Sequence, residues 1–151
     1  MSDRTCVDMT VSELASFNPR QADDLDRLIS QLGEGCRARP ERVRAAIESP
    51  DSHLYVVTET EGEGAIIACA TLCICRTPEL TIGLVEAVVV SPRFRGQGLG
   101  KALMDRIIRD AKALDVTTLH LTSHPSRVAA NGLYQSLGFK RKDTNFYTMN
   151  L

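Results

Sequence analysis

The sequence predicts an α/β fold in which helices cover both faces of a mixed β-sheet. Three observations indicate this fold. Helix-like and strand-like segments alternate along the chain, residues 82–91 form a nearly continuous apolar strand, and an amphipathic helix follows from Leu99. The 151 residues suffice for one hydrophobic core, and no repeat or linker divides them. We therefore expect a single domain over residues 1–151.

The first half of the chain predicts two helices followed by a β-hairpin. Pro19 begins a helical pattern that Gly33 stops, and Pro40 begins a shorter helix that ends at Ser49-Pro50. Two segments rich in β-branched and aromatic residues flank the turn EGEG. In order, the expected elements are a strand at 6–11, helices at 19–32 and 40–48, and strands at 53–60 and 65–77 around the turn at 61–64.

The second half predicts a strand, a long helix, another strand and a second helix, with one or two strands at the end. Leu99, Leu103 and Ile107 lie on the apolar side of the long helix. The expected elements are a strand at 82–91, a helix at 99–114, a strand at 117–123, a helix from Pro125-Ser126 through Tyr134 that Gly138 closes, and strands within 139–151. The order is β-α-α-β-β-β-α-β-α-β(-β), with helices on both faces of the sheet.

Composition excludes several classes of protein. A net charge of −1 and a pI near 6.3 argue against nucleic acid or an anionic membrane as a partner. The apolar runs are too short to span a bilayer, and acidic residues occupy the region where a signal peptide would be apolar. Five cysteines without framework spacing favour reduced thiols and a cytoplasmic location. Three of them, Cys69, Cys73 and Cys75, share a strand face without nearby histidines, so we expect no metal site.

The segment RFRGQGLGKAL, residues 93–103, places three glycines at alternating positions directly before the long helix. A dinucleotide-binding loop requires G-x-G-x-x-G after the first strand, whereas here the last spacing is one residue shorter and the loop follows the fourth strand. A nucleotide-triphosphate loop requires glycine and a hydroxyl residue where Arg95 and Ala102 stand. Neither of these two nucleotide motifs is therefore present.

The same segment still has the chemistry of an anion site. Glycines let the backbone approach a ligand closely, and a helix beginning at Leu99 presents unpaired N–H groups at its positive end. Arg93, Arg95 and Lys101 add positive charge nearby. We expect a pyrophosphate to bind here; the alternative is a tight strand-to-helix turn with solvated basic residues.

A second segment, RVAANGLYQSLGF at 127–139, helps to decide what the glycine-rich segment binds. Together with VVVSPRFRGQGLGKAL it resembles the GNAT superfamily of acetyl-CoA-dependent N-acetyltransferases. The first segment resembles the family loop [QR]-x-x-G-x-[GA], and the second resembles its A-x-x-L-Y-x-x-x-G-F helix. Where many family members have asparagine, seven residues before the tyrosine, this chain has Arg127.

The resemblance implies acetyl-CoA as co-substrate and a splayed central sheet. In the family, the pantetheine arm of the cofactor pairs with main-chain groups of the strand before the glycine loop, as an added strand would. The loop backbone holds the pyrophosphate, and Asn131 is expected to take over the contact of the missing asparagine. The positions implied for the cofactor are Val88, Val90, Arg95, Gly96, Gln97, Gly98, Gly100, Lys101 and Asn131.

The resemblance makes Tyr134 the proton donor to the departing thiolate. A phenol of pKa near ~10 that protonates a thiolate near ~8.5 does so uphill by roughly 2 kcal/mol, so orientation of the sulfur by a hydrogen bond stays an alternative role. Glu86 is the candidate general base, acting through water. We expect it on one strand face with Leu84 and Val88, where partial burial would raise its pKa. His120 and water are alternative bases.

The predicted function is therefore N-acetylation of a primary amine by direct attack on acetyl-CoA. The acceptor is a small molecule or a protein amine. The resemblance implies that the segments 33–44 and 140–147 contact it. Their basic residues favour an anionic, amino-sugar-like molecule, and solvated surface charge is the alternative explanation for them. The alternative function is a catalytically silent CoA-binding module that acts as a sensor or partner protein. The sequence does not decide the oligomeric state, so the protein can be a monomer or a homodimer.

Overall fold

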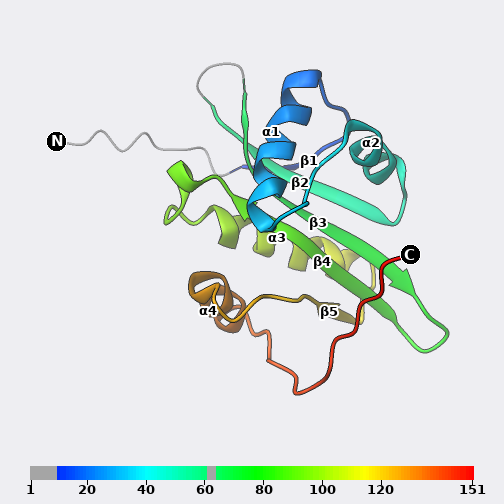
Figure 1. Cartoon of the computed structure of the whole chain (residues 1–151). Helices are drawn as coiled ribbons and strands as arrows, with labels where there is room; N and C mark the ends of the chain where they lie inside the picture. The colour runs from blue at the N-terminus through cyan, green and yellow to red at the C-terminus, as the bar shows by residue number, and fades with distance from the viewer. Residues whose placement is uncertain (1–9, 61–63) are drawn as a thin grey trace.

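The computed structural model describes residues 10–60 and 64–151, and it has a five-stranded sheet of order β1-β2-β3-β4-β5 (Figure 1). The first four strands are antiparallel neighbours, whereas β5 runs parallel to β4. This arrangement confirms the predicted mixed α/β class. The strands are β1 (Val11–Glu13), β2 (Ser52–Thr58), β3 (Ile66–Arg76), β4 (Thr81–Val90) and β5 (Thr118–His120).

Helices cover both faces of the sheet, as expected (Figure 1). They are α1 (Pro19–Ile29), α2 (Pro40–Glu48), α3 (Leu99–Ala113) and α4 (Val128–Ser136), with short 3-10 helices at Ser30–Leu32 and Pro92–Phe94. Helices α1 and α2 lie on one face, and α3 lies on the other. Asn18 caps α1: its side chain accepts from the backbone N–H of Gln21, whose own side chain accepts from the N–H of Asn18.

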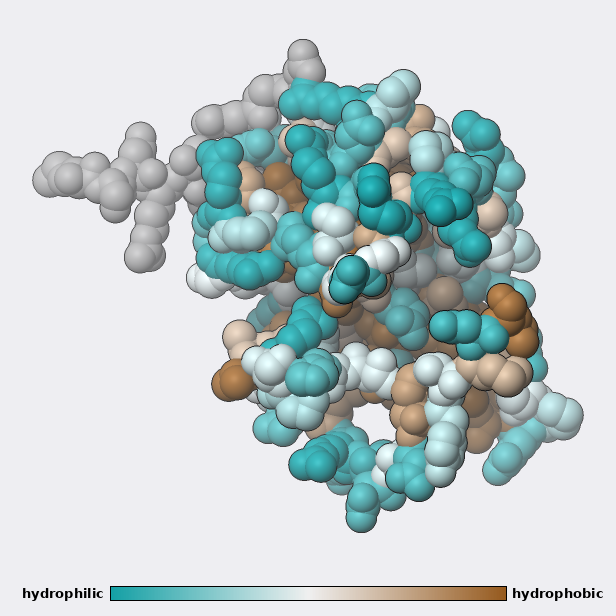
Figure 2. All heavy atoms as spheres, in the orientation of Figure 1, coloured by the Kyte–Doolittle hydropathy of each residue, from teal (hydrophilic) through white to brown (hydrophobic). Residues whose placement is uncertain are grey.

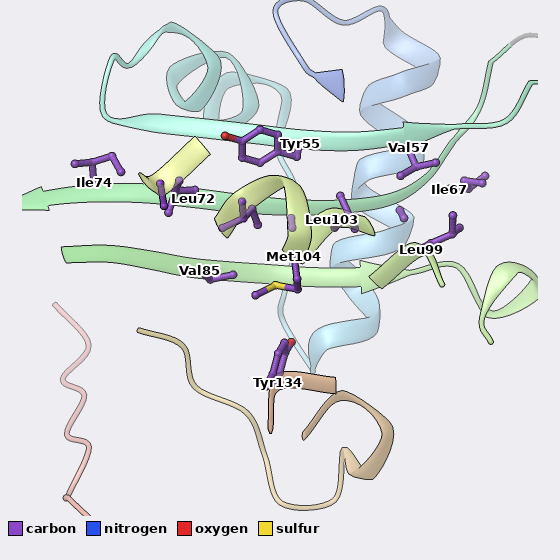
Figure 3. Close-up of a cluster of buried hydrophobic side chains, with 14 residues drawn as sticks. Tyr55, Val57, Ile67, Leu72, Ile74, Val85, Leu99, Leu103, Met104 and Tyr134 are labelled. Atoms are coloured by element: carbon purple, nitrogen blue, oxygen red, sulfur yellow. The ribbon is translucent and has the colours of Figure 1, made fainter. Parts of the chain in front are cut away.

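Each face of the sheet has its own hydrophobic core. On the α3 face, Leu103, Met104 and Ile107 pack completely buried against Tyr55 and Leu72 (Figure 3). On the other face, α1 and α2 contribute Leu25, Leu28 and Val43, which pack against strand residues that include Leu54 and Val56. The sheet therefore lies between two apolar layers, which hold β4 in place between β3 and the edge strand β5.

Two expected elements fall wholly or partly outside the described residues, and one helix begins later than expected. The expected strand at 6–11 falls mostly on residues 6–9, outside the described residues, and β1 begins at Val11. The turn at 61–63 also lies outside them. Helix α4 begins at Val128 rather than at Pro125-Ser126, because the His124 ring accepts the N–H of Ser126 and holds that segment in a turn.

The expected strands within 139–151 are wrong, because these residues form no strand in the structure. Strand β5 is only three residues long, so it offers a short edge for pairing. The segment also begins with four consecutive charged residues after Phe139, Lys140 to Asp143. Pairing would thus make few hydrogen bonds and bury little surface, and the segment is exposed from residue 140 onward.

No helix within the described ranges 10–60 and 64–151 is long and apolar enough to cross a membrane.

Gly83 is the β4 residue that lets β5 pair closely, and its replacement by alanine is expected to destabilise the protein. A Cβ at Gly83 would lie 2.6 Å from Leu119 Cδ2, 3.0 Å from Leu72 Cδ1 and 3.1 Å from Val116 Cγ1. Three crowded side chains must shift together, so we expect a loss of about 1–3 kcal/mol in the free energy of unfolding. Urea denaturation measures this loss.

Gly132→Ala is the matched control for this substitution. Gly132 is a helical residue of α4, and nothing lies within 4 Å of a Cβ built there. Alanine at such a position is expected to stabilise the helix by about 0.5–1 kcal/mol. Equal stability of the Gly83→Ala protein and the parent would show that β5 does not pack against β4 as described.

Candidate active site

Strands β4 and β5 separate after a short stretch of pairing. They pair only where Ile82 to Leu84 face Thr118 to His120, whereas β4 continues to Val90. Beyond Leu84 the side of β4 that faces β5 is therefore open to a ligand that offers hydrogen-bonding groups. In Figure 2 the visible face is hollowed between the half formed by α1 and α2 and the part formed by α4 and the C-terminal segment.

A β-bulge at Ala87 changes which side chains point to each face of the sheet. The β3–β4 register shifts between Cys69, which pairs with Val89, and Thr71, which pairs with Glu86, and Ala87 has a φ of 52°. Val89 belongs to the core under α1 and α2, whereas Val88 packs against the core on the α3 face. The expectation that Glu86 and Val88 share a face is wrong, because the inserted residue reverses the alternation.

The loop between β4 and α3 exposes its backbone. Gly96 and Gly98 have φ values of 74° and 84°, a left-handed conformation that favours glycine, and Gly98 is the N-cap of α3. No side chain caps the helix, and nothing lies within 4 Å of a Cβ built at Gly96. First-turn N–H groups at the positive end of α3 are thus without a side-chain cap, which suits the pyrophosphate of acetyl-CoA.

The third glycine, Gly100, has a packing role. A Cβ built on it would lie 3.4 Å from Leu133 Cδ2 and 4.0 Å from Val90 Cγ2. It thus lets α4 approach the start of α3. The side chains around the loop are not free: Lys101 pairs with Asp105 at 2.6 Å, and Arg95 donates to the carbonyl oxygen of Val90 at 3.1 Å. Arg95 also donates to Gln31 at 2.9 Å, which ties the loop to the end of α1.

Tyr134 lies in the core between α4 and β4, and its side chain is 5% exposed (Figure 3). Its ring meets the edge of Phe139 at a centroid distance of 6.0 Å. Burial raises the pKa of the Tyr134 hydroxyl, and the positive charge of Arg127 partly opposes this increase. At neutral pH the residue is therefore a protonated phenol beside the open part of β4.

The two candidate bases lie where β4 and β5 separate, and both are exposed. Glu86 was expected to be partly buried, which is wrong: it follows Val85 in regular register, so it lies on the α1–α2 face, and it is exposed. Burial raises the pKa of the neighbouring Cys73 thiol, and the negative charge of Glu86 adds to this increase. His120 pairs with Leu84 at the end of β5. Glu86 and Tyr134 therefore lie on opposite faces of β4.

Two contacts at the site were not predicted from the sequence. Arg127 donates from Nη2 to the carbonyl oxygen of Val88 at 3.2 Å, and Gln31 accepts from Arg95. For Arg127 the sequence did offer a signal, because many members of the family have asparagine at this position. Asn131 donates from Nδ2 to the carbonyl oxygen of His124 at 2.9 Å and holds the loop before α4; its contact with the pantetheine arm stays a prediction.

The basic segments expected at the acceptor differ in environment. Arg37 pairs with Asp26, with Nε 2.9 Å and 3.0 Å from the carboxylate oxygens, so its charge is neutralised locally. The hydrogen bond from Arg37 lowers the pKa of Asp26, and the bond from the backbone of Ala38 acts in the same direction. Residues 140–147 are fully exposed. Across residues 10–60 and 64–151, no group of three or more His, Cys, Asp or Glu side chains is placed to hold a metal ion.

Known proteins share this arrangement. The structure of glucosamine-6-phosphate N-acetyltransferase from Arabidopsis thaliana superposes with a TM-score of 0.75 at 21% identity, covering 93% of this chain and 97% of that one. This likeness shows that the two proteins share a fold. Residues 21–139 match the family model described as "Acetyltransferase (GNAT) family". The chain belongs to the GNAT acetyltransferase family, as the sequence motifs predict.

Curated relatives match over part of their length. Mycothiol acetyltransferase from Beutenbergia cavernae is 31% identical over 98 residues, which are 65% of this chain and 32% of the relative. The [ribosomal protein bS18]-alanine N-acetyltransferase of Escherichia coli K12 is 42% identical over 52 residues, 34% of this chain and 35% of the relative. The matched stretches thus span about a third of the length of these two proteins.

Proposed function

We propose that the protein transfers the acetyl group of acetyl-CoA to a primary amine. The observation that carries this proposal is the juxtaposition of an open β4 edge, an uncapped glycine-rich helix start and a buried phenol. Family membership supports it, because GNAT proteins take acetyl-CoA. When bound, acetyl-CoA supplies an activated acetyl thioester.

Two parts of the chain would hold the co-substrate. The N–H groups of the loop from Arg95 to Lys101, at the positive end of α3, would bind the pyrophosphate. The main chain at Val88 and Val90 would bind the pantetheine amides, since β4 has no strand partner on that side beyond Leu84. The cofactor would lie beside the guanidinium groups of Arg127 and Arg95, which donate to the carbonyl oxygens of these two residues. A backbone N–H in this stretch is also suited to stabilise the oxygen on which negative charge develops.

Proton transfer would be divided between the two faces of β4. Tyr134 would hold on its phenol oxygen the proton that the departing sulfur requires, and burial keeps this oxygen protonated. Glu86 would accept the proton of the amine through water on the α1–α2 face. Because an alkylamine with a pKa near ~10 is mostly charged at neutral pH, this deprotonation must precede attack.

The acceptor is proposed at the level of a primary amine. Relatives are named for mycothiol and for the alanine of a ribosomal protein, and a protein of the same fold is named for an amino-sugar phosphate. These names include both small molecules and a protein amine. The pairing of Arg37 with Asp26 removes one of the charges that favoured an anionic acceptor.

A thiol-release assay with acetyl-CoA and a panel of amines tests the proposal. The panel contains amino sugars, polyamines, amino acids and peptides with free amino termini. Turnover with any of them, with the N-acetyl product identified by mass spectrometry, supports the proposal. Saturable CoA binding without turnover across the panel would favour the alternative, a CoA-binding sensor.

Replacing Glu86 by glutamine is expected to reduce kcat/KM and to remove the acidic limb of its pH profile. Glutamine keeps the size of the side chain but cannot accept a proton, whereas affinity for CoA should be unchanged. Glu79→Gln is a matched control, because Glu79 is exposed in the turn between β3 and β4, away from the splay. An acidic limb that persists in Glu86→Gln would assign the base to His120 or to water.

A further inference from the structure

Arg127 is the residue directly before α4, and its guanidinium spans the gap between α4 and β4. Nη2 lies 3.2 Å from the carbonyl oxygen of Val88. This carbonyl is past Leu84, the last β4 residue that pairs with β5. A permanent positive charge is therefore placed at the edge that opens where the two strands separate.

Arg127 and Tyr134 meet the same part of β4. Arg127, the N-cap of α4, donates to the Val88 carbonyl, and the Val88 side chain packs against the buried cluster that contains Tyr134. The core around the Tyr134 ring contains Val85, Met104 and Phe139, all apolar. Burial among them raises the pKa of Tyr134, and Arg127 is the charged group that opposes the increase.

We propose that Arg127 is a positioning residue for proton donation by Tyr134, with its guanidinium held at the Val88 carbonyl to stabilise the developing phenolate. The inference rests on the proposed acetyl transfer. In that reaction the amine nitrogen–carbon bond forms and the carbon–sulfur bond breaks. The ammonium loses one proton to Glu86 or water before attack, and the nitrogen loses a second to solvent as the amide forms. The sulfur gains one proton from Tyr134, and solvent reprotonates the phenolate.

The positive charge of Arg127 would make proton transfer from Tyr134 to the thiolate less unfavourable. An ordinary phenol is about 1.5 pKa units too weak an acid to protonate an ordinary thiolate efficiently. Burial increases this mismatch, because it disfavours the phenolate. An opposite charge nearby reduces it by about one unit or more, since it stabilises the ionised form. The exposed position of Arg127 allows screening by water, so we expect an effect near one unit.

The test is a titration of Tyr134 in the free protein, with a ring-fluorinated tyrosine incorporated and fluorine NMR as the readout. The more acidic fluorophenol titrates at lower pH, which helps the fold to stay intact. The chain has three tyrosines, and Tyr134→Phe identifies the signal of interest. In Arg127→Met we expect the Tyr134 pKa to rise by about one unit, whereas Arg127→Lys should retain most of the parent value.

Arg76→Met is the matched control, because Arg76 lies at the end of β3 and pairs with Asp51 at the surface. An unchanged Tyr134 pKa in Arg127→Met would overturn the proposal, as would a loss of acetyl-CoA affinity with no change in this titration, since Arg127 would then only cap Val88. The titration needs neither acetyl-CoA nor an acceptor. Its failure is thus distinguishable from failure of the proposed acetyl transfer.

Discussion

Replacing Tyr134 by phenylalanine is expected to lower kcat by about 10²–10⁴-fold, the usual scale for loss of a general acid. The substitution removes one hydroxyl from a buried ring whose packing is otherwise apolar, so folding and CoA affinity should change little. A loss nearer tenfold would indicate that the hydroxyl only orients the sulfur through one neutral hydrogen bond, worth about 1–1.5 kcal/mol. Single-turnover kinetics, with chemistry shown to be rate-limiting, distinguish these two results.

Tyr55→Phe is the matched control. Tyr55 is also buried, and its hydroxyl donates to Asp110 at 2.9 Å, near the end of α3 and away from the splay. Its loss is expected to cost about 1 kcal/mol of stability but to leave kcat unchanged. If Tyr134→Phe turned over at the rate of the parent, Tyr134 would have no part in the mechanism.

Replacing Gly98 by valine is expected to abolish acetyl-CoA binding at concentrations that saturate the parent protein. Gly98 has a φ of 84°, and a β-branched residue is strained by about 1–2 kcal/mol or more in this conformation. The added side chain would also cover the first-turn N–H groups of α3, on which the pyrophosphate is proposed to bind. Isothermal titration calorimetry measures the affinity, and circular dichroism verifies the fold.

Gly64→Val separates the strain from the loss of the site. Gly64 also has a left-handed φ, 69°, and nothing lies within 4 Å of a Cβ built there. It precedes β3, outside the β4–α3 loop, so valine should reduce stability by a similar amount without changing CoA affinity. Normal CoA binding by a folded Gly98→Val protein would contradict the assignment of this loop.

Features that depend on local sequence could be predicted. The helix starts at Pro19 and Pro40 were located correctly, because proline is favoured in the first helical turn. The glycine-rich loop was located for a similar reason, since positive φ values and an uncapped helix start require glycine at 96 and 98. The candidate roles of these residues in binding stay predictions.

Features that depend on strand pairing could not be predicted. The bulge at Ala87 lies within the apolar run AVVV, in which no residue signals a change of face. The exposure of Glu86 depends on which part of the α1–α2 face the helices cover, so the strand pattern alone did not indicate it. The contact between Arg127 and Val88 joins residues 39 positions apart, so only the folded chain brings them together. The strands expected within 139–151 were wrong for a different reason. The composition of this segment permits strands, but β5 is too short to offer an edge for pairing.

The open edge of β4 also bears on whether copies of the protein can associate through strand pairing. An unpaired strand edge is a template on which another extended chain can pair, and natural sheets protect such edges with charge or by covering them. Here Arg95 and Arg127 each place a guanidinium on a carbonyl of that edge, at Val90 and Val88. Both arginines keep the charge at any physiological pH, so a neighbouring molecule that approached the edge would have to displace a cation before it could pair. We therefore expect the two arginines to oppose strand pairing by another copy at the edge that suits an extended ligand.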